Sequence, residues 1–446
     1  MFFVRINSKY QIFDGSLSDL RVKGLFQDDR TLWLNAILYF GQNLNFGEHT
    51  WQLTLWAPGH LLFSSVTYLI FGKLLLVIGF NYFITFLLMT LVLMQIHCWL
   101  DQVKVKFSIS LIILALFLFS PIYTSALVDT FFMSDLQATI AGSLAILRLI
   151  SLIDSQKLNS KLEHFNIAAL LAFAGYMRLT YYQLTIYVLL FSALYLLFVS
   201  IRQRNKDRNF GYDKVFFIFK ISVITFLIFL PWILVRGYII FPGNLSKGLE
   251  FSTQGRFALQ AQWYDDIRLK TDPQFPLIGQ GIACKVDKVK CDFFTNQNRE
   301  ISNGSLKITM DEDFDLKSKA AIETFVRSPI KWIEYKSPTY GPSFFQSSVY
   351  DTIDKNLHIS WDRILILLFF IINPFLWIYI KLKRFKLVVG TLPLILLSCF
   401  QLVQFLLTQL LFRFYLPAIA FTLMASLLLI VSLRDAHLKS TYETGK

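Results

Sequence analysis

Charged residues are scarce in this chain. Only 16% of its 446 residues are charged, whereas soluble domains contain about a quarter. Hydrophobic residues make up 55% of the chain, and the mean hydropathy is +0.51. The formal net charge of +13 does not indicate a nucleic-acid binder, because the basic residues are scattered in short runs between apolar stretches. The composition therefore excludes a soluble globular protein and predicts an all-α polytopic membrane protein.

Phosphate-binding loops and metal-ligand clusters are also lacking. No Gly-rich loop follows a strand pattern, and no paired-carboxylate motif lies on a soluble domain, which argues against a nucleotide substrate. No cofactor is expected, and a divalent metal has no support in the sequence. Glu48 and His49 could bind an acceptor or a metal, but no second ligand stands at a suitable spacing, so no metal site is expected.

Cysteine is rare, with four residues in the chain. Cys98 and Cys399 lie in apolar stretches, where a lone cysteine is usually a small packing residue. Cys284 and Cys291 lie close together in a polar segment, so they form either a disulfide in an oxidising compartment or two free thiols. Zinc is disfavoured because no histidine lies near this pair.

The chain instead contains long apolar runs. A window of about 20 residues, the length that crosses a bilayer, predicts about nine spans. They are expected at residues 74–99, 107–126, 134–153, 165–178, 181–200, 215–235, 363–380, 387–410 and 414–433. Leu61–Gly72 is too short to cross alone and is expected in the membrane interface.

Short basic runs orient these spans. Lys104, Lys157, Arg204 and Lys383 belong to connections that fall on one side, and the positive-inside rule makes that side cytoplasmic. The tail 434–446 is then cytoplasmic as well. The opposite side holds the first sixty residues and the polar segment 236–362. Residues 1–30 contain neither a signal peptide nor a spanning helix, so either a leading span is missing from the chain as given, which we expect, or the start folds on the outer side unaided.

This topology divides the chain into five parts. They are an extracytoplasmic segment 1–60, a first bundle 61–235, an extracytoplasmic loop domain 236–362, late spans 363–433 and the cytoplasmic tail. The loop is too long for a simple connection. Its first half, Phe241–Asp315, is expected to form an irregular cap of mixed structure. Its second half, Leu316–Tyr335, has helical spacing and is expected to lie on the outer leaflet, with Pro329 kinking or ending the helix.

An acidic pair precedes the first apolar stretch. Asp28 and Asp29 are followed by the amphipathic run Thr31–Phe40 and then by Trp56-Ala57-Pro58-Gly59-His60. Charges beside a bilayer tend to persist where they are solvated, paired or used. One aspartate could equally cap the helix that begins near Arg30, since Asp is a favoured N-cap. Catalysis and capping are both open for this pair.

These features together resemble the GT-C glycosyltransferases, and within them the protein mannosyltransferase and aminoarabinose transferase branch. The resemblance covers nearly the whole chain, although each motif alone is weak. It departs from the family at Ala57, where a second proline is common, and at His60. The motifs that carry it are Asp28-Asp29 with Trp33 and Ala36, Trp56-Ala57-Pro58-Gly59, Asp135, Gly175-Tyr176-Met177-Arg178, Lys319–Phe345 and Arg413-Phe414-Tyr415-Leu416-Pro417.

The resemblance implies sugar transfer from a polyprenyl-phosphate donor to a glycan, lipid or protein acceptor on the non-cytoplasmic face. Such transfer needs a general base at the acceptor and positive charge at the leaving phosphate. Asp28 or Asp29 is the expected base. Arginine suits the phosphate because its planar fork binds two oxygens; snorkelling at span ends is the alternative. The expected substrate-binding residues are Arg30, Arg178, Arg413, Asp135, Glu48 and His60. For Asp135, capping of the helix that it opens is an equally open interpretation.

Two other functions stay open. A polytopic transporter or flippase of a lipid-linked or small polar substrate would show repeats and polar residues midway along its spans, and neither is evident. A polysaccharide polymerase or ligase is disfavoured because the acidic pair lies so early. The expected location is the cell (inner) membrane, with membrane lipids as partners, a role in glycan or envelope biosynthesis and no nucleic acid.

Overall fold

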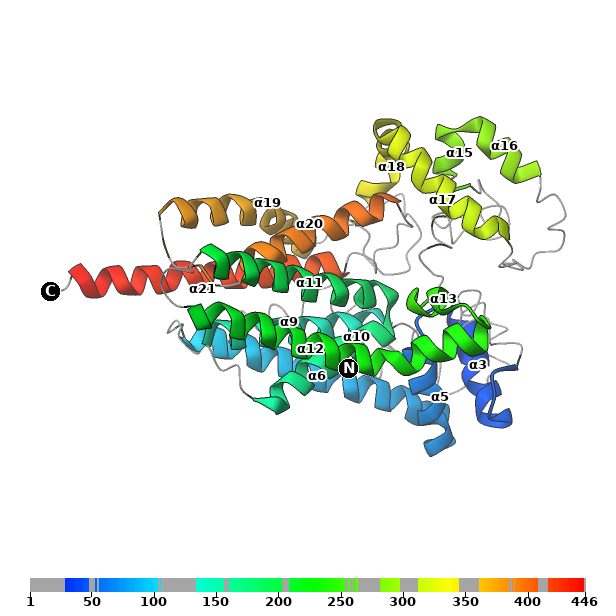
Figure 1. Ribbon diagram of the computed structural model, residues 1–446, viewed down its shortest axis with the longest axis horizontal. Coiled ribbons are helices and arrows are strands. Elements are labelled where there is room, and N and C mark those ends of the chain that lie inside the picture. Colours follow the sequence, from blue (N-terminus) through cyan, green and yellow to red (C-terminus); the bar gives the residue numbers. More distant parts are fainter. Residues whose placement is uncertain are drawn as a thin grey trace. The chain divides into compact units, whose positions relative to one another are not determined.

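The computed structural model describes ten long stretches of the chain, the short pieces 261–263 and 387–388, and a few single residues. The long stretches are 29–47, 56–102, 134–155, 160–202, 208–252, 281–296, 312–344, 361–383, 390–407 and 416–444. All regular structure in these stretches is helical, without a strand (Figure 1). The chain divides into two compact units. The first comprises Met1–Ser252, Phe375–Pro393 and Met424–Lys446, and the second comprises Thr253–Pro374 and Leu394–Leu423.

The first unit contains a bundle around α10. Its helices before the loop are α3 (Asp29–Asn43), α5 (Gly59–Phe71), α6 (Leu74–Gln102), α9 (Asp135–Ser155), α10 (Lys161–Met177), α11 (Leu179–Arg202), α12 (Arg208–Leu234), the π-helix η2 (Val235–Ile240) and α13 (Leu245–Leu249). Helix α10 packs against α5, α9, α11 and α12, while α6 packs against α9 (Figure 1). Helix α9 is the most enclosed of the long apolar helices described, with 83% of its most apolar 18-residue stretch buried. The side chains at its N-terminal end, Asp135 among them, therefore lie inside the bundle.

Local sequence sets the ends of these helices. Ser160 caps α10 by accepting a hydrogen bond from the Glu163 backbone N–H, 3.3 Å away, and the Ser-x-x-Glu spacing is that of a capping box. Helix α5 ends where Gly72 takes a left-handed φ of 63° and its N–H bonds to the Tyr68 carbonyl. A residue without a Cβ adopts that conformation at little cost.

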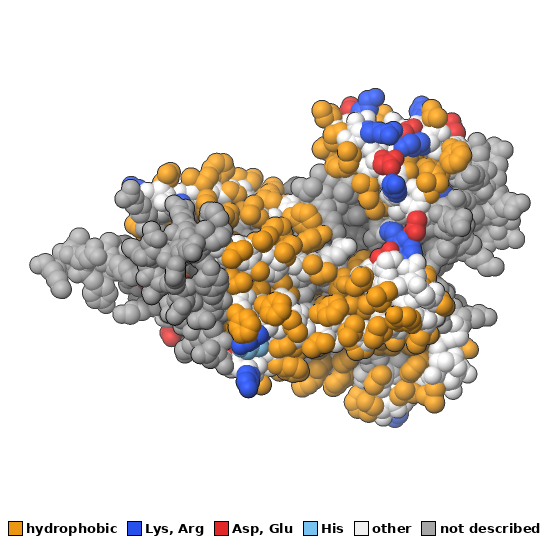
Figure 2. Space-filling model, viewed as in Figure 1, with side chains coloured by type: hydrophobic (Ala, Val, Ile, Leu, Met, Phe, Trp, Pro, Cys, Tyr) orange, Lys and Arg blue, Asp and Glu red, His pale blue; other side chains and the backbone are white. Residues whose placement is uncertain are grey.

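Six helices of the described stretches are long and apolar enough to cross a membrane, which indicates a multi-pass membrane protein. They are Leu76–Asp101, Asp135–Asp154, Leu179–Leu197, Val215–Ile240, Ile364–Leu382 and Leu416–Ala436. Many of their large apolar side chains are exposed, among them Phe83, Met94 and Phe226. Figure 2 shows hydrophobic side chains over most of the described bundle surface on the face drawn. A surface this apolar needs a lipid or protein cover.

Three of the nine expected spans are not among these six. The span 107–126 lies outside the described residues. The span 165–178 corresponds to α10, which has only 17 residues and carries Lys161 and Glu163 in its first turn. The span 387–410 corresponds to α20 (Thr391–Leu407), also 17 residues long where it is described. Leu61–Gly72, expected to be too short to cross, is the 13-residue helix α5.

The second unit holds the helical part of the long polar loop. Its helices are η3 (Ala261–Trp263), α15 (Ile282–Val286), α16 (Lys288–Asn296), α17 (Glu312–Arg327) and α18 (Pro329–Phe344). The described part of the expected irregular cap is thus helical. The expected single helix Leu316–Tyr335 is two helices, because α17 ends at Arg327 and Pro329 is the first residue of α18. Proline suits that position, where its missing N–H would have no partner anyway.

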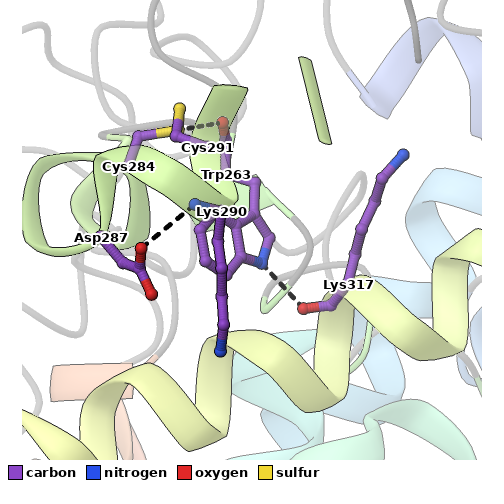
Figure 3. The surroundings of a disulfide bond; sticks show 6 residues. All are labelled: Trp263, Cys284, Asp287, Lys290, Cys291 and Lys317. Carbon is purple, nitrogen blue, oxygen red and sulfur yellow. Dashed lines mark hydrogen bonds between the residues drawn. A yellow bond between two sulfur atoms is a disulfide. The ribbon is translucent and has the colours of Figure 1, made fainter. Parts of the chain in front are cut away.

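A disulfide joins Cys284 and Cys291, whose Cα atoms lie 4.7 Å apart. Figure 3 shows Trp263 beside it, with the indole Nε1 donating to the Lys317 carbonyl at 2.8 Å. The core around Trp263 also contains Phe294, 4.8 Å away between ring centroids, and Trp332. The bridge therefore fastens α15 and α16 to a small core that α17 and α18 complete.

The late helices are α19 (Trp361–Leu382), α20 and α21 (Leu416–Thr444). The buried side chain of Asn373 on α19 donates to the Thr422 carbonyl of α21 at 3.0 Å. Ser398 on α20 lies 2.6 Å from the hydroxyl of the same Thr422. Hydrogen bonds between apolar helices satisfy polar groups that hydrocarbon cannot.

Lys336 on α18 is almost completely buried, with 1% of its surface exposed. Burial lowers the pKa of its amine from 10.5 to about 7. The unfolded chain keeps the ordinary value and binds more protons between these two pKa values, so the stability of the folded state rises with pH from about 7 to 10.5. Below pH 7 the amine is protonated in both states and the full desolvation cost remains.

Replacing Lys336 with Met should therefore stabilise the protein at pH 7, by on the order of a few kcal/mol. The gain should shrink as the pH approaches 10, where the wild-type amine is already neutral when buried. Thermal unfolding of the purified full chain at both pH values measures this difference. Lys331→Met, at an exposed position of the same helix, is the control. An equal gain at both pH values would contradict the lowered pKa.

Candidate functional site

The first unit brings a carboxylate and a guanidinium together, where α9 begins and α10 ends. Asp135 opens α9, and Arg178 follows the last residue of α10. The Arg178 Nε donates to the Asp135 Oδ1 at 2.6 Å, and the Arg178 Nη2 contacts the same oxygen. Each residue is only 8% exposed. This is a buried ion pair between the start of one helix and the end of another.

Helix polarity favours this arrangement. The first turn of a helix carries partial positive charge and the last turn partial negative charge. Asp135 lies at the positive end of α9 and Arg178 at the negative end of α10, so each charge also interacts favourably with its own helix. Next to Asp135, the Ser134 hydroxyl donates to the Met177 carbonyl at 2.7 Å. That bond satisfies one of the carbonyls that the end of α10 leaves without an intrahelical donor.

The Asp135 carboxylate has capacity beyond this pair. Both contacts from Arg178 go to Oδ1. The buried Oδ2 accepts no hydrogen bond from the described part of the chain. An ionised carboxylate that lacks a donor on one oxygen is costly to bury. The oxygen therefore keeps its capacity to accept a hydrogen bond.

Glycine permits the close packing around the ion pair. A Cβ on Gly59, the first residue of α5, would lie 2.6 Å from the Tyr176 carbonyl group, and no real Cβ comes that close. His60 follows in the first turn of α5 and is 1% exposed. A Cβ on Gly175 would lie 2.6 Å from the Phe229 ring. The missing side chain of Gly59 thus lets the start of α5 approach Tyr176, and that of Gly175 lets the Phe229 ring of α12 approach α10.

A buried polar cluster lies on the neighbouring helices. The Gln137 amide of α9 donates to the Thr85 hydroxyl at 3.1 Å and to the Asn81 carbonyl at 3.1 Å, both on α6. The Asn81 amide in turn reaches the Ser64 hydroxyl of α5 at 3.5 Å. All four side chains are completely buried. We name Ser64, Asn81, Thr85 and Gln137 the amide cluster; it ties α5 and α6 to the helix that carries Asp135.

Arg236 is a second buried guanidinium in the first unit. It lies in the π-helix that ends α12, is 0% exposed, and donates from Nε to the Lys247 carbonyl at 2.9 Å. Its guanidinium also lies 4.9 Å from the centre of the Phe241 ring. Single π-helical turns occur often at functional sites. Arg236 holds the turn that leads from α12 to α13.

The structure describes some of the residues expected at the site and not others. The structure brings Asp135 and Arg178 together and places His60 at the start of α5. Asp29 and Arg30 form the first turn of α3, but their side chains are not described. Asp28, Glu48 and Arg413 lie outside the described residues. The described residues contain no group of three or more His, Cys, Asp or Glu side chains that could hold a metal ion.

Sequence reasoning missed the amide cluster. Its signal was present, because Asn81 and Gln137 are amides inside otherwise apolar stretches, and such residues in spans tend to pair with one another. What the sequence lacks is the partner assignment. Asn81 and Gln137 stand 56 positions apart, and only the packing of α6 on α9 brings them together.

Comparison with known proteins gives no further guide to the site. No protein-family model matches the chain, no curated protein matches its sequence, and no solved structure matches it.

Proposed function

We propose that this chain is a GT-C-like membrane glycosyltransferase that moves a sugar from a polyprenyl-phosphate donor to an acceptor on the non-cytoplasmic face. The observation that carries the proposal is the buried Asp135–Arg178 pair at the end of α9 and α10. By the positive-inside rule this end faces away from the cytoplasm, as do Asp28 and Asp29. A lipid-linked phosphate would present its sugar on that face.

The chemistry divides between carboxylate and guanidinium. Asp28 or Asp29 takes the proton from the acceptor hydroxyl or amine, whose oxygen or nitrogen forms the new bond to the anomeric carbon of the sugar. The bond from that carbon to the phosphate oxygen breaks, and its electron pair leaves with the polyprenyl phosphate. Arg178 stabilises the negative charge of the leaving phosphate, with Arg30 and Arg413 as further phosphate contacts. The Asp135 Oδ2 accepts a hydrogen bond from a sugar hydroxyl.

A guanidinium can bind a phosphate and a carboxylate at the same time. Arg178 has five N–H donors in a planar fork, and Asp135 engages Nε and Nη2. The Asp135 carboxylate fixes the orientation of the Arg178 guanidinium before a ligand binds. Less side-chain entropy is therefore lost when the ligand binds. His60 and Glu48 are proposed acceptor contacts. No cofactor is required by this scheme.

The finer topology belongs to the same proposal. We infer nine spans, with 107–126, α10 and α20 completing the six long helices, and a cytoplasmic tail at 434–446. The loop domain 236–362 then lies outside the cytoplasm. Its helices α17 and α18 carry exposed apolar residues, Val326 at 68% and Ile330 at 79%, next to the basic Arg327 and Lys331. Such a surface suits the outer leaflet, and Figure 2 shows charged and apolar side chains side by side over α15–α18.

Transport of a lipid-linked or small polar substrate is the second candidate. The amide cluster favours it, because transporters place polar side chains between their spans. Transport requires no general base, so a test of the expected base distinguishes transport from sugar transfer.

The Asp28→Asn, Asp29→Asn double variant should lower sugar transfer by about 10²–10⁴-fold, the usual contribution of a general base. Transfer is measured as polyprenyl phosphate released from a panel of polyprenyl-phosphate sugars in proteoliposomes. Asp101→Asn, at an exposed position in the last turn of α6, should leave the rate unchanged. Unaltered transfer by a folded double variant would rule out catalysis by the pair. Substrate movement without release of polyprenyl phosphate would favour transport.

Cysteine labelling tests the orientation. In a background with Cys98 and Cys399 replaced by Ser, Val289→Cys at a position 82% exposed should react with a membrane-impermeant maleimide in intact cells. Lys383→Cys, exposed after α19, should react only once the membrane is permeabilised. The reverse pattern would overturn the placement of the loop domain.

A further inference from the structure

Phe251 has a backbone conformation that bulky residues rarely adopt. Its φ is 66°, in the left-handed region, where the Cβ of an L-residue crowds the backbone. The side chain is 0% exposed. Such strain persists only where the surroundings hold the residue firmly, and it concentrates at functional positions. The contacts of Phe251 are therefore informative.

Three aromatic rings surround the Phe251 ring within the first unit. It stacks on Tyr182 of α11 with 4.3 Å between centroids and 12° between planes. It meets Phe229 of α12 at 5.1 Å and Tyr176 of α10 at 5.3 Å, both edge to face. We name Tyr176, Tyr182 and Phe229 the aromatic box. Stacked and edge-to-face pairs add attraction beyond the area that they bury.

Hydrogen bonds fix the backbone around the same ring. The Phe251 carbonyl accepts from the Trp232 indole at 3.0 Å. The Tyr182 hydroxyl donates to the Leu249 carbonyl, also at 3.0 Å. Residues 249–251 are thus bound to α11 and α12 through side chains, in addition to the ring contacts. This set of contacts overcomes the backbone strain at Phe251.

Two members of the aromatic box flank the turn that carries Arg178. Tyr176 lies two residues before Arg178, and Tyr182 lies four residues after it. The turn itself is closed by bonds from the Arg178 N–H to the Ala174 carbonyl at 3.0 Å and from the Tyr182 N–H to the Arg178 carbonyl at 3.2 Å. Since Phe251 contacts the tyrosines on both sides, removing its ring loosens both ends of the turn.

The chain leaves the first unit directly after this contact. Ser252 is the last residue of this stretch of the first unit, and the second unit begins at Thr253. Phe251 therefore packs on the bundle two residues before the chain enters the second unit.

We propose that Phe251 is a positioning residue: the docking of its ring into the aromatic box holds the Arg178 turn in place and couples residues 249–252 of the outer loop to the Asp135–Arg178 pair. The consequence for substrate rests on the proposed function. Coupling between two sites is reciprocal, so a lipid phosphate that tightens the Arg178 turn also tightens residues 249–252.

Hydrogen exchange of the full chain in nanodiscs tests the coupling without any substrate. In Phe251→Ala the amides of residues 178–182 should exchange about tenfold faster or more, because loss of a buried aromatic ring opens the structure that it holds. Phe217→Ala removes an equally buried ring of α12, 2% exposed and packed on His164. That control should leave the Arg178 turn unchanged. Equal exchange at the turn in both variants would overturn the proposal.

Tyr182→Phe covers the case in which Phe251→Ala does not fold. It keeps the stacked ring and removes only the bond to the Leu249 carbonyl. Exchange should rise about two- to fivefold at 178–182 and 249–252, in line with one lost hydrogen bond. No change at residues 178–182 would contradict the coupling.

Added polyprenyl phosphate separates this proposal from the proposed function. It should slow exchange at both 178–182 and 249–252 in the wild type and at neither segment in Arg178→Gln. If Phe251→Ala loosens the turn while polyprenyl phosphate protects nothing, the coupling stands and the proposed donor is wrong. If the lipid phosphate protects the turn but leaves 249–252 unchanged, the coupling fails and the donor stands.

Discussion

The buried ion pair between Asp135 and Arg178 is the interaction on which the rest of the first unit depends. Two charges with 8% exposure each would be strongly unfavourable alone, and breaking such a pair costs about 3–5 kcal/mol. The pair is possible because α9 and α10 present their opposite poles at the same end of the bundle. The tight approach of Gly59 to Tyr176 brings α5 to the same end of α10.

Around this pair, polar contacts occur as separate groups between apolar helices. The amide cluster joins α5, α6 and α9, while the Tyr176 and Tyr182 hydroxyls bind the Ile228 and Leu249 carbonyls. In hydrocarbon an unsatisfied polar group costs several kcal/mol, so these bonds also fix which helix faces meet. The position of Arg178 is thus determined from three directions: by Asp135, by the packing of α5 and by Phe251.

Hydropathy was sufficient to predict most helices, and span ends were sufficient to single out Asp135 and Arg178. Their pairing was not predictable, because it depends on α10 packing against α9. The expected span 165–178 was shorter than α10, which begins four residues earlier at Lys161 and carries Glu163 in its first turn. Pro329 marked a break, but the pattern alone did not show that it begins a new helix. Nothing in the sequence signals the left-handed backbone at Phe251, because only tertiary contacts stabilise it.

The central claim is that Arg178 binds the phosphate of a lipid-linked donor. The direct measurement is the affinity of the purified protein for polyprenyl phosphate in nanodiscs. Arg178→Gln should bind about tenfold more weakly or worse, as expected for a lost charge-assisted hydrogen bond. Arg148→Gln, which removes the guanidinium paired with Glu163 at 3.8 Å, should bind as the wild type does. Because Arg178→Gln leaves Asp135 unpaired, the Asp135→Asn, Arg178→Gln double variant provides a neutral form for comparison. Wild-type affinity in either folded Arg178 variant would contradict the claim.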